Sequence, residues 1–220
     1  GGKTTDAPEI LRGRHGMVSF SRPDQLNIVM DACQSFVLDN GAFSEWKKTG
    51  GAIDFNAYVD WVCSIYRHPG FDWCLIPDVI GGSEADNAIL VNKWLRLGLK
   101  AKGVPVWHLD ESIGYLEWMV ENFQWVALGS SGRWPNPGTK GWWERMREAM
   151  RVCCDELGRP KVKLHGLRML DPEIFQHLPL AGADSTNAAR NNNQLKRFGM
   201  YAPPSAGQRA ATIAARIENY

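Results

Sequence analysis

The chain lacks the features that mark several specialised classes of protein. Its five cysteines are an odd number, with no C-x-x-C pair and no neighbouring histidine at metal-ligand spacing, so we expect reduced thiols and no metal site. No run approaches the ~18 apolar residues of a membrane span, and the first residues include no apolar signal region. These absences favour a cytoplasmic protein without a membrane partner.

An excess of charge of one sign is also missing. Lys and Arg total 25 against 24 acidic residues, a formal charge of +1, so the overall basic field of many nucleic-acid-binding proteins is absent. Any contact with a polyanion must therefore be local. The G-x-G-x-x-G motif of a Rossmann phosphate loop does not occur either.

What the chain does contain is six short apolar runs that end in small or polar residues. The ends are 38–41, 76–78, 107–111, 127–132, 164–166 and 182–186. Segments with helix signals lie between or after them, at 54–66, 83–97, 112–122, 141–157, from 172, and at 208–217. This alternation favours α/β architecture with parallel strands, and the missing Rossmann motif favours a (β/α)8 barrel, TIM-like, over an open sheet.

The length of 220 residues and the 44% of hydrophobic residues suit one domain with a substantial core. Residues 1–16 are polar, and we expect them to form a loosely held arm. The barrel domain is then 17–220. In a barrel the carboxyl ends of all strands converge on one face, so residues far apart in the chain can share a pocket.

Two aspartates follow the first two apolar runs. Asp39 precedes a turn that Gly41 permits, and Asp78 follows Pro77. Each could be a nucleophile, a general base or a hydrogen-bond acceptor for a substrate, and each could equally be a capping or turn residue.

The next three runs end in less specific groups. Because adjacent side chains of a strand point in different directions, we expect at most one of the two acids after His108 to face the pocket. We choose His108 and Asp110 as the candidate site residues of this run. His165 is either a ligand-binding or a structural histidine. A Gly/Ser turn, formed by Gly129, Ser130, Ser131 and Gly132, offers N–H groups and hydroxyls to a phosphate or a base edge.

Asp184 follows three small residues that leave room for a substrate, and Ser185 and Asn187 add hydrogen-bonding groups; its alternative role is a helix cap. The stretch that follows is basic and acid-free as far as residue 217. It could hold nucleic-acid phosphates or form a solvated helix face. The basic residues chosen as phosphate contacts are Arg190, Lys196 and Arg197.

Taken in order, these residues resemble the tRNA-guanine transglycosylase superfamily, in particular its shorter phage-associated relatives that act on DNA. The family's Asp-x-Gly-Gly-Phe strand end is similar to residues 39–43, its base-recognising aspartate to Asp78, its Leu-Gly-Gly loop to 128–130, and its late Asp-Pro-Thr-Arg-Asn-Ala-Arg to 184–190. Two departures are Ala42 in place of a glycine and the lack of a counterpart to the family's Cys/His zinc subdomain.

The resemblance implies a barrel enzyme that breaks the N-glycosidic bond of a nucleobase, by base exchange or by excision. Asp184 would be the nucleophile and Asp39 the proton-transferring partner or an alternative nucleophile. Asn40 and Phe43 would join the strand-end residues in binding a flipped or single-stranded nucleotide. The expected partner is nucleic acid, DNA rather than tRNA, with a free base in the exchange reaction and no cofactor.

Two other hypotheses use the same residues. A barrel enzyme acting on a small phosphorylated metabolite would bind phosphate at the Gly129–Gly132 turn. A non-enzymatic nucleic-acid-binding module would use the acids only as caps. The sequence leaves the oligomeric state and the target base open.

Overall fold

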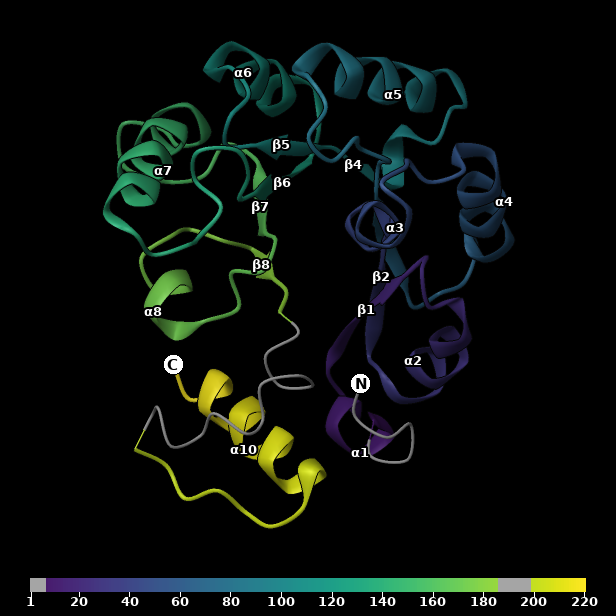
Figure 1. Ribbon diagram of the computed structural model, residues 1–220, viewed down its shortest axis with the longest axis vertical. Coiled ribbons are helices and arrows are strands. Elements are labelled where there is room, and N and C mark those ends of the chain that lie inside the picture. Colours follow the sequence, from purple (N-terminus) through teal and green to yellow (C-terminus); the bar gives the residue numbers. More distant parts are fainter. Residues whose placement is uncertain (1–6, 186–198) are drawn as a thin grey trace.

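A computed structural model describes residues 7–185 and 199–220 (Figure 1). The strands are β1 (His15–Ser19), β2 (Ser35–Asp39), β3 (Phe71–Leu75), β4 (Gly103–Val104), β5 (Val106–His108), β6 (Trp125–Gly129), β7 (Lys163–Gly166) and β8 (Gly182–Ala183). The helices are α1 (Ala7–Leu11), α2 (Leu26–Ala32), α3 (Ala42–Thr49), α4 (Phe55–Ile65), α5 (Glu84–Arg96), α6 (Ile113–Asn122), α7 (Lys140–Cys153), α8 (Pro172–Phe175) and α10 (Ala206–Glu218). Short 3₁₀ turns occupy Pro23–Gln25 and Lys100–Lys102.

The strands form a curved wall of parallel neighbours, with helices around the outside (Figure 1). One half has the order β1-β2-β3-β4 and the other β5-β6-β7-β8. Pro105 separates β4 from β5 and has no N–H to donate, yet its carbonyl accepts from the Ala127 N–H at 2.9 Å. The stretch 103–108 therefore serves as one barrel strand that joins the two halves.

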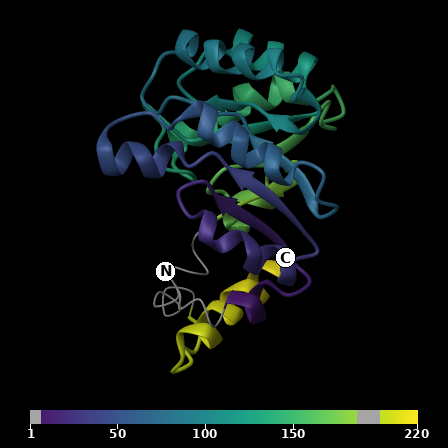
Figure 2. The same ribbon diagram turned by 90° about the vertical axis from the view of Figure 1, so that its right-hand side faces the viewer.

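No hydrogen-bonded ladder joins β8 to β1 within residues 7–185 and 199–220, so the barrel has a seam there. Figures 1 and 2 place α10 beside α1, next to this seam. Arg14, just before β1, pairs with Glu218 of α10, with 2.8 Å between Nη2 and Oε2. The last helix is thus tied to the first strand.

Apolar side chains form one cluster outside each half and a third inside the barrel. Trp94 of α5 is fully buried in the cluster beside β1–β3, and Trp142 of α7 in the cluster beside β5–β8. The interior cluster consists of Trp73, Leu75, Val104, Val106 and Ala127. Because strand residues alternate between faces, the inward positions continue to the carboxyl ends of the strands and fix which residues face the pocket.

Helix signals in the sequence account for most helix starts. Asp54 accepts from the N–H groups of Asn56 and Ala57, and Ser83 forms a reciprocal capping box with Asp86. Helix α7 ends at Cys153, before the predicted 157, because Cys154 is extended and bridges to Pro160 while the Asp155 carboxylate accepts N–H groups of the intervening turn.

The prediction of an α/β barrel of parallel strands in one domain is confirmed, and all six apolar runs contribute strands. With 103–108 counted as one strand, the described residues form seven barrel strands, and eight were predicted. The sequence analysis missed β1 and β4, which contain few apolar residues, and α1, α2 and α3. The boundary at residue 17 stays a prediction; β1 begins at His15. In the described part of the chain, we find no helix with the length and apolar character to cross a membrane.

The tight contact between Gly103 and Trp94 gives a test of the packing. A Cβ on Gly103 would lie 2.2 Å from Trp94 Nε1, which donates to the Leu99 carbonyl at 3.1 Å. We expect Gly103→Ala to lower the free energy of unfolding by about 1–3 kcal/mol in urea denaturation.

The same change at Gly114, exposed in α6 with 3.9 Å to its nearest neighbour, is the control. Gly114→Ala should raise the free energy of unfolding by about 0.5 kcal/mol. Equal effects of the two changes would contradict the packing described for Trp94.

Candidate functional site

Polar side chains replace the apolar interior at the carboxyl ends of the strands. Asp39 lies two residues beyond the inward Val37 on β2, and His108 two beyond the inward Val106 on β5. His165 on β7 pairs in register with the inward Ala127. Strand alternation therefore directs all three side chains toward the barrel axis.

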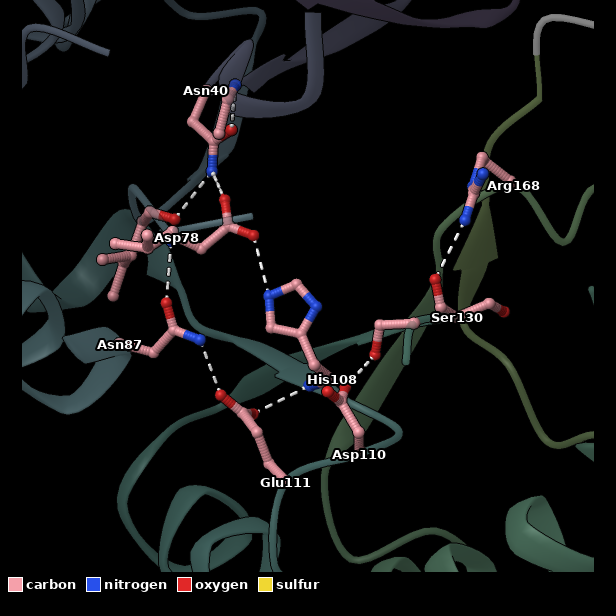
Figure 3. Close-up of polar contacts among 12 residues, drawn as sticks. Asn40, Asp78, Asn87, His108, Asp110, Glu111, Ser130 and Arg168 are labelled. Carbon is pink, nitrogen blue, oxygen red and sulfur yellow. Dashed lines mark hydrogen bonds and ion pairs between the residues drawn. The ribbon is translucent and has the colours of Figure 1, made fainter. Parts of the chain in front are cut away.

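Asp78 and His108 form the central contact of this site (Figure 3). Asp78 Oδ2 lies 2.8 Å from His108 Nε2, and Asp78 Oδ1 accepts from Asn40 Nδ2 at 2.8 Å. Burial lowers the pKa of His108, but the hydrogen bond and charge of Asp78 outweigh it and raise the pKa. Asp78 thus favours the charged form of the histidine. Residues from β2, β3 and β5 meet here.

A second set of buried contacts fixes the loops that carry this pair (Figure 3). Glu111 accepts from the His108 backbone N–H at 2.8 Å and from Asn87 Nδ2 at 2.7 Å. Asn87 Oδ1 in turn accepts from the Val79 N–H at 2.8 Å. Burial raises the pKa of Glu111, whereas these donors lower it. The network ties the residue after Asp78 to the backbone of His108.

Asp39 is the acid whose protonation the site alters most clearly. Burial raises the pKa of its carboxyl to about 6. The Ser19 hydroxyl and the Gly41 N–H lower the pKa, and the charges of Asp184 and Asp78 raise it. The three aspartates singled out in the sequence are therefore close enough to interact. A carboxyl with this pKa can take up or give a proton near neutral pH.

The Gly129–Gly132 turn lies at the end of β6, beside the loop after β5. Ser130 Oγ accepts from the indole Nε1 of buried Trp142 at 2.9 Å, and the Ser131 hydroxyl bonds the exposed Asp110. Asp110 therefore contacts the turn, whereas the neighbouring Glu111 supports His108. Sequence reasoning selected Asp110 and missed the structural part of Glu111.

His165 and Asp184 form a looser pair opposite Asp78 and His108. His165 Nε2 lies 3.5 Å from Asp184 Oδ1, and neither ring nitrogen has a hydrogen bond from another described residue. The ring is 4% exposed and meets Trp73 edge-on at 4.8 Å. Gly182 provides the space, since a Cβ there would lie 3.1 Å from His165 Nδ1.

Two arginines in or around the site were missed by sequence reasoning. Arg145 of α7 lies between the rings of Trp107 and Trp134 and donates to the Leu109 carbonyl at 2.8 Å, which anchors the loop after β5. Arg168 follows β7, and its backbone N–H donates to Asp184 Oδ1 at 3.0 Å. Neither contact can be predicted from the pattern of apolar residues along the chain.

The remaining predicted residues are at the edge of the site or outside the described chain. Phe43 is 44% exposed on α3, which projects from the barrel (Figure 2), and Ser185 directly follows Asp184. The predicted residues Asn187, Arg190, Lys196 and Arg197 lie outside the described residues. Across residues 7–185 and 199–220, no group of three or more His, Cys, Asp or Glu is placed to hold a metal ion.

Comparison with known proteins places the chain near one group of solved structures. No protein-family model and no curated protein matches the chain. A mutant tryptophan synthase alpha-subunit from the hyperthermophile Pyrococcus furiosus matches with a TM-score of 0.52 and 11% identity over 94% of this chain and 98% of that chain. A structure on the mutual activation of the tryptophan synthase α2β2 complex from the same organism matches with a TM-score of 0.51 and 11% identity, again over 94% of this chain and 98% of that chain.

These findings contradict the resemblance to the tRNA-guanine transglycosylase superfamily, so that prediction is wrong. The N-glycosidic reaction on DNA or tRNA, and the nucleic-acid partner and free base it implied, are wrong with it. The physical reason lies in the barrel itself. Acids at successive strand ends converge in any barrel of this kind, so their order along the chain indicates the fold rather than the reaction.

The raised pKa of Asp39 predicts how stability depends on pH. Its folded-state pKa of about 6 lies above the ordinary 3.8, so the stabilisation is present below pH 4 and is lost as the pH rises through 6. Asp39→Asn removes this loss. We expect the free energy of unfolding of the variant to exceed that of wild type by on the order of 1 kcal/mol at pH 8. The difference should vanish near pH 4, as measured by urea unfolding at several pH values.

Asp86→Asn is a control with the opposite sign, because the Ser83 hydroxyl and N–H lower the pKa of Asp86. Asp86→Asn should have a lower free energy of unfolding than wild type at pH 8, and this difference should shrink as the pH falls. A pH profile of Asp39→Asn parallel to that of wild type would contradict the burial of the Asp39 carboxyl.

Proposed function

We propose that this chain is an enzyme that acts on a small phosphorylated metabolite by general acid–base chemistry. The observation that carries the proposal is the convergence of three residues at the carboxyl end of a barrel: Asp39 and His108 at inward strand positions, and Asp78 in the loop after β3. Active sites of barrel enzymes lie at this end, in the loops after the strands.

The residues take different parts in the proposed reaction. Asp39, with a pKa of about 6, would take a proton from the substrate or return it. His108, whose pKa Asp78 raises, would donate a hydrogen bond or a proton to an oxygen that gains negative charge. The hydrogen bond that Asn40 donates to Asp78 and the one that Glu111 accepts from the His108 backbone hold this pair in place.

The substrate class follows from the loops around these groups. The Gly129–Gly132 turn, which follows β6, offers backbone N–H groups of the kind that bind anions. The likeness to tryptophan synthase alpha-subunits supports a metabolic barrel enzyme at the level of fold. All five cysteines are free, which supports the proposal of a cytoplasmic location.

The reaction can be sought in D₂O with three- to six-carbon phosphate monoesters and their dephosphorylated counterparts, followed by ¹H and ³¹P NMR. We expect hydrogen–deuterium exchange or product formation only with phosphorylated compounds. Asp39→Asn should lower this rate about 10²–10⁴-fold, because it removes the proton-transferring group.

His177→Gln changes an exposed histidine outside the site and should leave the rate unchanged. Equal turnover of a dephosphorylated counterpart would contradict the substrate class. A full rate in Asp39→Asn would contradict the catalytic assignment, and failure of every phosphate ester to bind would contradict the proposal as a whole.

A further inference from the structure

Arg168 is the non-glycine residue that adopts a positive φ, +59°, in the part of the chain that the structure describes. This left-handed conformation is strained for a residue with a Cβ and costs glycine nothing. Strained positions that persist are concentrated in functional sites. The turn at Arg168 directs its backbone N–H to Asp184 Oδ1, so the strained residue lies beside the acid whose charge acts on Asp39.

The side chain of Arg168 extends toward the end of the neighbouring strand (Figure 3). Its Nη2 donates to the Ser130 carbonyl at 3.0 Å, and its guanidinium carbon lies 5.5 Å from the centre of the Phe43 ring. The residue thus connects the loop after β7 with the turn after β6 and with α3. A glycine would satisfy the backbone but make neither of these contacts.

The guanidinium keeps most of its donors available to a ligand. A guanidinium has five N–H donors in a planar fork, and here the Ser130 carbonyl takes one. Among the described residues, no carboxylate forms an ion pair with it. An exposed fork of this kind fits two oxygens of a phosphate group. Its positive charge would also offset the repulsion between a phosphate and the nearby carboxylates Asp39 and Asp184.

We propose that Arg168 is the residue that binds the phosphate group of the substrate and so sets the specificity of the site. This inference rests on the proposed function. Its geometry joins phosphate binding to chemistry, because the same residue holds Asp184 through its backbone and the anion through its side chain. The strain at Arg168 is then retained for recognition rather than for folding.

The test measures binding of inorganic phosphate and of glycerol 3-phosphate to the full chain by titration calorimetry. Arg168→Gly relieves the strained backbone and removes the contacts with Ser130 and Phe43, whereas Arg168→Ala removes the same contacts and keeps the strain. We therefore expect a higher denaturation midpoint for Arg168→Gly than for Arg168→Ala. We expect the Kd for both probes to rise at least tenfold. Arg168→Lys keeps the charge without the fork and should give an intermediate Kd. Arg67→Gly, a loss of charge in the exposed loop before β3, should bind like wild type.

Each outcome decides a separate point. If wild type binds the probes and Arg168→Gly binds them equally well, the assignment of Arg168 is wrong while the proposed function stands. If Arg67→Gly weakens binding as much as Arg168→Gly, general charge accounts for the effect and the assignment is wrong. A denaturation midpoint of Arg168→Gly at or below that of Arg168→Ala would overturn the strain argument. If neither the probes nor any phosphorylated metabolite binds wild type, the proposed function fails as well.

Discussion

The contact between Asp78 and His108 is the interaction on which the site depends. It joins β3 of one half of the barrel to β5 of the other, and a buried amide at each end holds it in place: Asn40 bonds Asp78, and Asn87 bonds Glu111, which in turn holds the His108 backbone. Buried polar groups that lack partners are costly, so each member of this network stabilises the position of the next. The raised pKa of His108 follows from the same arrangement.

The sequence was sufficient to predict the alternation of strands and helices and the residues at the strand ends. The charges of Asp78 and Asp184 act on Asp39, and all three were found in the sequence because an apolar run followed by a polar cluster marks where a buried strand leaves the core. The residues that hold the site could not be found in this way. Asn87 is a helical asparagine and Arg145 a helical arginine, and their contacts are with residues 24 and 36 positions away.

The error about function has a related origin. Motifs of four or five residues at strand ends described the barrel correctly and the reaction wrongly, because the fold alone brings such residues together. Arg168 illustrates the missing information. Nothing in the letters Leu-Arg-Met-Leu indicates a left-handed backbone, and the neighbours of its side chain come from two other parts of the chain. Recognition by this residue depends on tertiary geometry that no local pattern records.

The interruption of the middle strand at Pro105 has a mechanical consequence. The two halves have separate apolar clusters outside the barrel but share the interior cluster, to which Val104 and Val106 both belong. Asp78 belongs to one half and His108 to the other. A rotation of one half against the other would change the 2.8 Å separation of these two side chains. The NMR chemical shift of an isotope label on the His108 ring would therefore change with any rotation between the two halves.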